Sequence, residues 1–415
     1  MLLTVEQAWD QIVAHVPPAL PVRVPLMEAG GLVLAEEVLS TIDSPPFDKS
    51  MMDGYAVQRA DLQSNPAELR VISEVSAGQV PERPVEPGTA IRIMTGAPIP
   101  EGADAVIPLE WTSEVDSLVT FHRGADARSR LNILPRGESM RVGETLFRAG
   151  DRVSPQTVAV LAETGHAFPL VRTAPTVAIL ATGDELVDTD QTPGPGQIRN
   201  TNAVMLAAQV AEAGAIPRIL GIARDQRDDL RTRLLQGLES DVLVLSGGVS
   251  AGAYDLVPSE LANADVQAIF HKISMKPGKP CWFGTRPRQD GKPPTLVFGL
   301  PGNPVSSMVC FELFVRLALR RLTEGEVTRP DLRTAELTVP FQHRGDRSTW
   351  FPSQVSSHAG RLVVQPAPWK GSADLRSTAR ANCSLCVPTG EIDWEPGREV
   401  TILPWGRTFS RIDET

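Results

Sequence analysis

Three carboxylate side chains follow apolar, strand-like segments of the chain. Glu185 comes shortly after TVAILAT, Asp225 shortly after PRILGIA, and Asp255 lies further on after DVLVL. If these segments are strands of one parallel sheet, their carboxyl ends share an edge, and open α/β sheets bind ligands at that edge. Carboxylate oxygens are ligands that Mg²⁺ prefers. The pattern therefore predicts a magnesium site holding a phosphate; the alternative is that each acid only caps the helix that follows.

A glycine pair follows the strand-like segment DVLVL, in the stretch SGGVSAGAYD. Gly247 and Gly248 carry no side chain, so their backbone N–H groups can approach a phosphate closely at the start of a helix. The stretch has neither the GxxxxGK[ST] nor the GxGxxG spacing, so no general nucleotide motif identifies it. The alternative is that the glycines serve only the packing of a strand-to-helix turn.

Two proline-rich segments follow further along the chain. MKPGKP places Lys276 and Lys279 close together in a loop, and two neighbouring lysines are tolerated most easily when an anion lies between them. GLPGNPVSS places Pro301 and Pro304 ahead of a helix, with Ser306 in its first turn. These residues predict an anion-binding surface; the alternative is a pair of stiffened surface turns.

The elements that must position these residues follow a regular order from Pro175 onward. Strand-like segments alternate there with amphipathic segments long enough to be helices. This order is typical of βαβ units around a parallel sheet. It predicts a doubly wound, mostly parallel α/β domain over residues 173–327.

The remaining sequence predicts smaller parts. The first, 1–43, carries two helical patterns, VEQAWDQIVAHV and LMEAGGLVLAEEV, and is expected to pack with a helical linking segment, 142–172. Its first helix could instead belong with the α/β domain. Residues 44–141, rich in Pro, Gly and short alternating runs, predict a β-rich domain, and residues 328–415 predict a C-terminal β domain.

Composition limits the partners of this chain. Its 415 residues carry a formal net charge of −10, which argues against a general nucleic-acid surface. No signal peptide and no membrane-spanning run is recognisable, so we expect a soluble, cytoplasmic protein without a membrane partner. Cys383 and Cys386 form a single CxxC, which favours reduced thiols over a zinc site.

Six motifs, SGGVSAGAYD, MKPGKP, GLPGNPVSS, ATGDEL, FDKSMMDGYAV and RIMTGAP, occur together along the chain. In this arrangement they resemble the molybdopterin molybdenumtransferases, a family that includes the C-terminal domain of gephyrin. The resemblance covers nearly the whole chain. A related family, the molybdopterin adenylyltransferases, shares only the α/β domain.

The resemblance implies a molybdopterin-binding type of α/β domain and the insertion of molybdenum into adenylylated molybdopterin. Molybdate would be the metal source, AMP would be released, and Mg²⁺ would be the cofactor. The resemblance also implies a homodimer with its active site at the subunit interface, and a contact with the adenylyltransferase that supplies the substrate.

Site residues are implied by the resemblance at matching motif positions. Asp53 in SMMDGYAV and Thr95 in RIMTGAP correspond to functional positions, and Arg347 in GDRSTW and Ser372 in KGSADL lie where the family has an arginine and a serine near molybdate. The alternatives are an ordinary Asp-Gly turn at Asp53 and a structural surface arginine at Arg347. The expected catalytic residues are Glu185, Asp53, Thr95, Asp225 and Asp255, with Glu185, Asp225 and Asp255 as metal ligands. The expected substrate-binding residues are Gly247, Gly248, Ser250, Lys276, Lys279, Pro301, Pro304, Ser306, Arg347 and Ser372.

One motif departs from the family pattern. After Arg136-Gly137 the family commonly has Glu-Asp, whereas this chain has Glu138-Ser139. The loss of a carboxylate leaves open a preference for another oxyanion, such as tungstate. Two further alternatives stay open: a homologue that binds molybdopterin or nucleotide without the chemistry, and the adenylyltransferase reaction itself.

Overall fold

The computed structural model describes residues 2–64, 66–122, 132–248, 256–288 and 291–406. The chain forms two compact units. Unit 1 comprises residues 1–35, 150–155 and 168–415, and unit 2 comprises residues 36–149 and 156–167. The finer domain boundaries expected from the sequence stay predictions.

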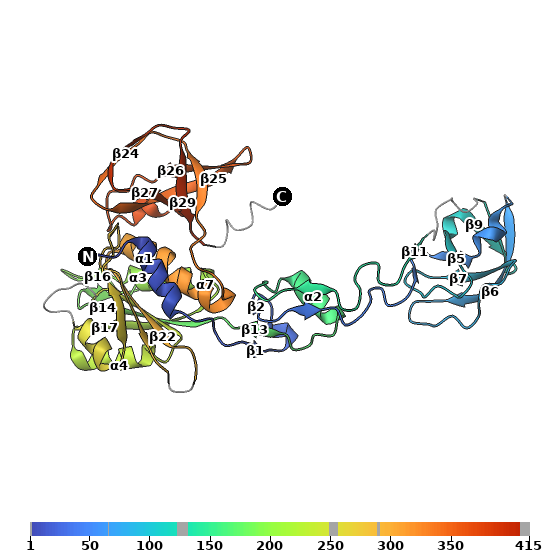
Figure 1. Ribbon diagram of the computed structural model, residues 1–415, viewed down its shortest axis with the longest axis horizontal. Coiled ribbons are helices and arrows are strands. Elements are labelled where there is room, and N and C mark those ends of the chain that lie inside the picture. The colour runs from blue at the N-terminus through green and yellow to red at the C-terminus, as the bar shows by residue number, and fades with distance from the viewer. Residues whose placement is uncertain (1, 65, 123–131, 249–255, 289–290, 407–415) are drawn as a thin grey trace. The chain divides into compact units, whose positions relative to one another are not determined.

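A six-stranded sheet forms the centre of the α/β domain in unit 1, in the order β17-β14-β18-β22-β21-β19. Figure 1 labels its strands β14, β17 and β22. The first four strands run parallel, and β21 and β19 are antiparallel to their neighbours. The expected mostly parallel α/β domain is confirmed. The strand bounds are β14 Thr176–Thr182, β17 Ile216–Ala223, β18 Val242–Ser246, β19 Gln267–His271, β21 Trp282–Arg286 and β22 Thr295–Leu300.

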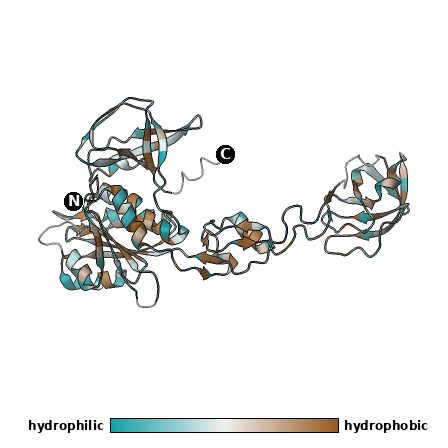
Figure 2. Ribbon diagram, in the orientation of Figure 1, coloured by the Kyte–Doolittle hydropathy of each residue, from teal (hydrophilic) through white to brown (hydrophobic). Residues whose placement is uncertain are grey.

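Helices cover both faces of this sheet because its strands alternate their apolar side chains. Val177 and Ile179 of β14 face a core shared with α1, α3, α6 and α7, whereas Ala178 and Leu180 face a core shared with α4 and α5. In Figure 2, most of α4 is coloured as hydrophilic. The helix bounds are α1 Val5–His15, α3 Thr201–Glu212, α4 Arg227–Gly237, α5 Val257–Asn263, α6 Pro304–Cys310 and α7 Arg316–Glu324.

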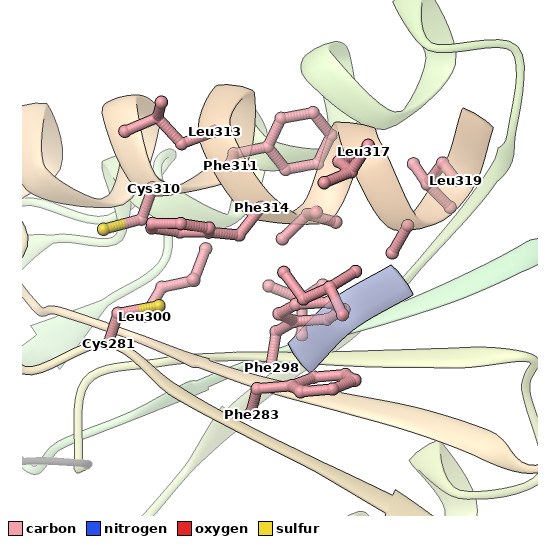
Figure 3. Close-up of a cluster of buried hydrophobic side chains, with 14 of the residues drawn as sticks. Cys281, Phe283, Phe298, Leu300, Cys310, Phe311, Leu313, Phe314, Leu317 and Leu319 are labelled. Atoms are coloured by element: carbon pink, nitrogen blue, oxygen red, sulfur yellow. The ribbon is translucent and has the colours of Figure 1, made fainter. Parts of the chain in front are cut away.

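One π-helical turn, Phe311–Val315, joins α6 to α7 and makes them a continuous rod against the sheet. Figure 3 shows the apolar side chains of this rod above those of β21 and β22. Trp9 of α1 belongs to the same core, and its indole N–H donates to the carbonyl oxygen of Leu313 at 3.0 Å. The first helix is therefore held by the α/β domain.

Strands of the C-terminal part form a ring. The five strands follow the order β25-β26-β23-β29-β27, and the order closes because β25 also pairs with β27. Each of these five strands therefore has a partner on both sides. Two residues of β20, in the MKPGKP segment, extend the sheet by pairing with β25. The bounds are β20 Met275–Lys276, β23 Arg333–Leu337, β24 Phe341–Gly345, β25 Ser348–His358, β26 Arg361–Pro366, η5 Arg376–Thr378, β27 Cys383–Val387, β28 Gly390–Trp394 and β29 Glu399–Pro404.

Unit 2 is built on a six-stranded sheet of order β8-β5-β7-β6-β10-β9, and it also holds most of helix α2. The β-rich character expected of this region is confirmed. The bounds are β3 Val38–Leu39, β4 Lys49–Ser50, β5 Gly54–Val57, η2 Arg59–Leu62, β6 Ala67–Val75, β7 Thr89–Ile93, β8 Ala105–Pro108, η3 Leu109–Trp111, β9 Thr112–Val115, β10 Leu118–Phe121, β11 Ile133–Leu134, β12 Thr145–Phe147 and α2 Pro155–Glu163.

The second predicted helix, LMEAGGLVLAEEV, is wrong. A single 3₁₀ turn, η1 Leu26–Glu28, is followed by Gly31 at φ 82°, a conformation that ends helical structure. The apolar residues after it pair as strands instead, with Leu34 opposite Val171. The bounds of the small remaining strands are β1 Val22–Arg23, β2 Val33–Leu34, β13 Leu170–Arg172, β15 Leu186–Val187 and β16 Ile198–Arg199.

Candidate functional site

A cleft of about 910 Å³ lies at the carboxyl ends of β14, β18 and β22, and we call it the main cleft. It gathers five of the residues expected from the sequence, namely Glu185, Gly247, Gly248, Pro301 and Pro304. Ser250 and Asp255 lie outside the described residues. The rule that ligands bind at the carboxyl edge of an open α/β sheet thus agrees with the position of the cleft.

The turn that carries Glu185 is fixed by Arg224, which follows β17. The Arg224 Nη1 donates to the carbonyl oxygens of Gly183, Asp184 and Leu186 at 3.4, 3.2 and 3.0 Å. The backbone N–H of Asp225 donates to Asp184 Oδ1 at 3.2 Å. These bonds hold the ends of two neighbouring strands together, and they leave the Glu185 side chain exposed at the cleft.

The expected magnesium site is only partly assembled in the described residues. Glu185 lines the main cleft, whereas Asp225 is exposed beside the Glu185 turn and does not line it. The described residues hold no group of three or more His, Cys, Asp or Glu that could bind a metal by themselves. Mg²⁺ is commonly held by one or two carboxylates together with water and a substrate phosphate, so these two acids suit it chemically.

Gly183 makes room for the Glu185 carboxylate. Gly183 has φ 139°, and a Cβ built on it would lie 2.3 Å from Glu185 Oε2. A Gly183→Ala variant is therefore expected to displace this carboxylate, and a displacement of about 1 Å can lower a rate by roughly 100-fold. The measurement is the rate of the AMP-releasing reaction proposed below.

The control for this variant is Gly291→Ala. Gly291 has φ 72°, and a Cβ there would meet no atom within 4 Å, so this variant places an alanine at another position of positive φ without a clash. Equal rates in the two variants would show that Gly183 does not position Glu185.

Gly247 and Gly248 are required by packing as well as by access to the cleft. Both have positive φ, 89° and 64°. A Cβ on Gly247 would lie 2.9 Å from the Thr182 carbonyl oxygen, and one on Gly248 would lie 2.6 Å from Thr182 Oγ1. The glycines therefore let the turn after β18 cross the end of β14 closely.

Asn202 of α3 is a site residue that the sequence analysis missed. Its side-chain amide donates to Ser246 Oγ and to the Gly302 carbonyl oxygen, both at 2.8 Å. It thereby ties the end of β18 and the loop after β22 to α3 at the wall of the main cleft. Asn200, two residues before it, is the N-cap of α3, but no local residue pattern indicates the cross-link made by Asn202.

A second, smaller cavity of about 230 Å³ adjoins the main cleft, and we call it the basic pocket. It gathers Lys276, Lys279, Ser306, Arg347 and Ser372, together with Pro301, which also lines the main cleft. These residues come from the loop after β19, from α6 and from the C-terminal part of the chain, so segments far apart in the sequence meet here.

Backbone contacts hold the parts of the basic pocket in place. Lys276 pairs with Thr349 between β20 and β25, and the Val305 N–H donates to the Ser372 carbonyl oxygen at 3.0 Å. Both lysine side chains are exposed, whereas Ser306 is 4% exposed. Three cationic side chains and two hydroxyl groups suit a small dianion with several oxygen atoms.

His343 lies behind this pocket and was also missed. Its Nε2 lies 3.0 Å from Thr349 Oγ1, and its ring stacks on Phe341 with centroids 6.1 Å apart. Burial, and then the charge of Lys276, lower the pKa of His343. The imidazole therefore adds no positive charge to the basic pocket near neutral pH.

Asp53 and Thr95 lie together in unit 2. The Asp53 carboxylate accepts hydrogen bonds from the backbone N–H and the hydroxyl of Thr95, both at 2.7 Å, and the backbone bond, followed by the hydroxyl, lowers the pKa of Asp53. The next residue must be glycine, because a Cβ on Gly54 would lie 2.0 Å from the Ile107 carbonyl oxygen.

A Thr95→Val variant is expected to raise the pKa of Asp53 part of the way back toward 3.8, since one of the two hydrogen bonds is lost. The bonds stabilise unit 2 only above the lowered pKa, and this contribution disappears as pH falls through it. Carboxyl-carbon NMR titration measures the shift, with Thr95→Ser as the control that keeps the hydroxyl. An identical Asp53 pKa in the Val and Ser variants would contradict the assignment.

The departure from the family pattern also lies in unit 2. Arg136 Nε donates to Asp43 Oδ2 at 2.6 Å, and the Arg136 N–H donates to Asp48 Oδ1 at 2.7 Å. Ser139 is exposed and its N–H donates to the Ser44 carbonyl oxygen. Arg136 is therefore already paired with an acid inside its own unit.

Family models match three successive parts of the chain. Residues 3–165 match the MoeA N-terminal region (domain I and II), residues 178–321 match the probable molybdopterin binding domain, and residues 334–405 match the MoeA C-terminal region (domain IV). No described helix is long and apolar enough to cross a membrane.

Individual relatives agree with these matches over nearly the full length. The molybdopterin molybdenumtransferase of Staphylococcus aureus is 31% identical over 97% of this chain and 95% of its own, and that of Bacillus subtilis is 35% identical over 89% and 86%. The crystal structure of a molybdopterin biosynthesis MoeA protein from Pyrococcus horikosii superposes with a TM-score of 0.80 at 29% identity, covering 98% of this chain and all of that one. The identity and coverage of these relatives show that the chain belongs to the molybdopterin molybdenumtransferase family.

Proposed function

We propose that the protein inserts molybdenum into the dithiolene of adenylylated molybdopterin, using molybdate and Mg²⁺ and releasing AMP. The observation that carries this proposal is the pair of adjoining cavities. The main cleft has a volume suited to a large phosphate-bearing ligand and the basic pocket suits a small dianion, while Pro280, Pro301 and Asn303 line both. The family membership supports the same role in molybdenum cofactor biosynthesis.

The residues of the two cavities would bind different parts of the reactants. Lys276, Lys279 and Arg347 would bind molybdate, with the hydroxyl groups of Ser306 and Ser372 as further hydrogen-bond partners. Gly247 and Gly248 would admit the substrate phosphate close to the backbone at the main cleft.

Glu185, with Asp225 beside it, would hold Mg²⁺ on the substrate phosphate. The bound ion would supply neutralisation of phosphate charge as AMP leaves. Arg224 would keep the Glu185 carboxylate in place through the carbonyl groups of its turn. Catalysis of this kind depends on position and electrostatics and involves no covalent intermediate on the protein.

Asp53 and Thr95 belong to unit 2, and the family resemblance implies that they act at the site of a partner subunit. We therefore also propose a homodimer whose active site lies at the subunit interface. Analytical ultracentrifugation tests the oligomeric state. Mixing a Glu185→Ala subunit with an Asp53→Ala subunit tests the shared site, because mixed dimers would recover one intact site.

The reaction itself is tested with purified protein, adenylylated molybdopterin, Mg²⁺ and molybdate. AMP release that requires molybdate and is abolished by Glu185→Ala is the expected result. Substrate binding without AMP release, with molybdate and with tungstate, would contradict the proposal and support a binding role. Consumption of ATP with unadenylylated molybdopterin would instead identify the adenylyltransferase reaction.

A further inference from the structure

A third cavity, of about 970 Å³, lies in the C-terminal domain, and we call it the outer groove. Its wall is formed by the middle of β25, the end of β26 and the segment that leads through η5. Lys370, Arg376 and Arg380 line it, and all three side chains are exposed. The neutral amides of Gln354 and Gln365 line it as well.

One carboxylate, that of Asp374, lines the outer groove, and it is hydrogen-bonded within its own turn. Asp374 Oδ2 accepts from the Lys370 N–H at 3.0 Å, and Oδ1 accepts from the Ser377 N–H at 3.2 Å. The hydrogen bonds of Ser377, followed by that of Lys370, lower the pKa of Asp374. Asp374 therefore serves the shape of the turn.

The two arginines have no such partner. Within the described part of the chain, the guanidinium groups of Arg376 and Arg380 make no hydrogen bond or ion pair. A cavity with three cations and one carboxylate reverses the sign of a protein whose net charge is −10. Guanidinium groups bind oxyanions through paired N–H donors, and amide side chains add neutral donors.

The outer groove adjoins both cavities of the proposed active site. Ala373 lines the groove and the main cleft, and Trp369 and Ser372 line the basic pocket. The segment from Trp369 to Ala373 is thus a wall shared by all three cavities. The outer groove and the basic pocket are therefore lined by neighbouring residues of one short segment.

We propose that the outer groove is a second anion-binding site, which takes tetrahedral dianions and raises their concentration beside the basic pocket. The chemistry is shared by two sources, free molybdate and the phosphate of a nucleotide such as AMP. Its role in delivering or releasing these anions rests on the function proposed above, whereas the binding itself does not.

Equilibrium binding tests the site without turnover. The variant is Arg376→Gln/Arg380→Gln, and the matched control is Arg218→Gln/Arg231→Gln, which removes two exposed charges that line none of the three cavities. Molybdate and AMP are titrated separately into the wild type and both variants by calorimetry. The Arg376→Gln/Arg380→Gln variant is expected to bind at least one of the two ligands with an affinity roughly 10-fold or more below that of the wild type.

The ligand whose affinity falls in the groove variant identifies the anion that the outer groove binds. A loss confined to molybdate assigns the groove to the free oxyanion, and a loss confined to AMP assigns it to the nucleotide phosphate. If both affinities in the groove variant equal those of the control, the groove is only a solvated charged face and the proposal is overturned. These outcomes can be read even if the protein releases no AMP in the reaction assay.

Kinetics then test the role of the site. For a delivery site, the groove variant is expected to raise the KM for molybdate by roughly 10-fold at low ionic strength with kcat unchanged, since electrostatic focusing of this kind is screened by salt. The control variant is expected to keep the wild-type KM. A lowered kcat with an unchanged KM would contradict a delivery role.

Discussion

Replacement of Lys276 and Lys279 together by glutamine is expected to reduce molybdate-dependent AMP release by roughly 100-fold or more. Each lysine lines the basic pocket and can donate a charge-assisted hydrogen bond to a bound dianion. Such bonds contribute about 1.5–3 kcal/mol each, so losing two removes about 3–6 kcal/mol of binding to the anion. The measurement is AMP release as a function of molybdate concentration.

The same variant is expected to fold normally, because both lysine side chains are exposed. The Arg218→Gln/Arg231→Gln variant removes the same charge elsewhere and is expected to keep its activity. Single Lys276→Arg and Lys279→Arg variants retain the charge and separate a need for positive charge from a need for the ammonium shape. Wild-type AMP release in the double glutamine variant would remove the basic pocket from the proposed reaction.

Replacement of Trp350 by alanine is expected to destabilise unit 1 by about 3–5 kcal/mol. Trp350 is 1% exposed, belongs to the core of the α/β domain and contacts Trp9 edge-on, with ring centroids 6.0 Å apart. It comes from β25 of the C-terminal ring, so it joins the ring to α1. The measurement is the denaturant dependence of the circular dichroism of the full chain.

A Trp350→Phe variant provides the matched comparison. The indole N–H of Trp350 is buried and has no hydrogen-bond partner among the described residues, so phenylalanine keeps the aromatic contact and removes an unpaired donor. Its cost is expected to be clearly smaller than that of the alanine variant, because the phenyl ring leaves a smaller cavity than a methyl group does. Equal losses in the alanine and phenylalanine variants would show that the indole edge, and not the buried ring, holds the two parts together.

Much of the α/β domain could be predicted because its signals are local. Apolar strands such as β14 alternate with amphipathic helices, and that order specifies a parallel sheet with helices on both faces. The structure of the segment LMEAGGLVLAEEV, in contrast, depends on contacts that are distant in sequence. Its apolar spacing suits a helix, but the turn at Gly31 and the partner strand β13, far away in sequence, decide its structure.

The candidate site was predictable where chemistry follows strand ends, as for Glu185, and where a motif matches the family, as for Lys279 and Arg347. Asn202 and Arg224 were missed, because their roles depend on hydrogen bonds to atoms of segments far away in sequence. No residue pattern along the chain encodes such bonds. The meeting of the MKPGKP segment with β25 is equally long-range, and only the structure describes it.

The two-residue pairing of β20 with β25 makes the basic pocket a seam within unit 1. The lysines stand on one side of this seam, and Arg347 and Ser372 stand on the other. An anion that bridges them would stabilise the joined form reversibly, because a ligand that binds only the joined form adds its binding free energy to that form. The concentration of the oxyanion would then determine how stably the C-terminal ring is joined to the MKPGKP segment. Amide hydrogen exchange at Ser348 and Thr349 would slow as the anion binds.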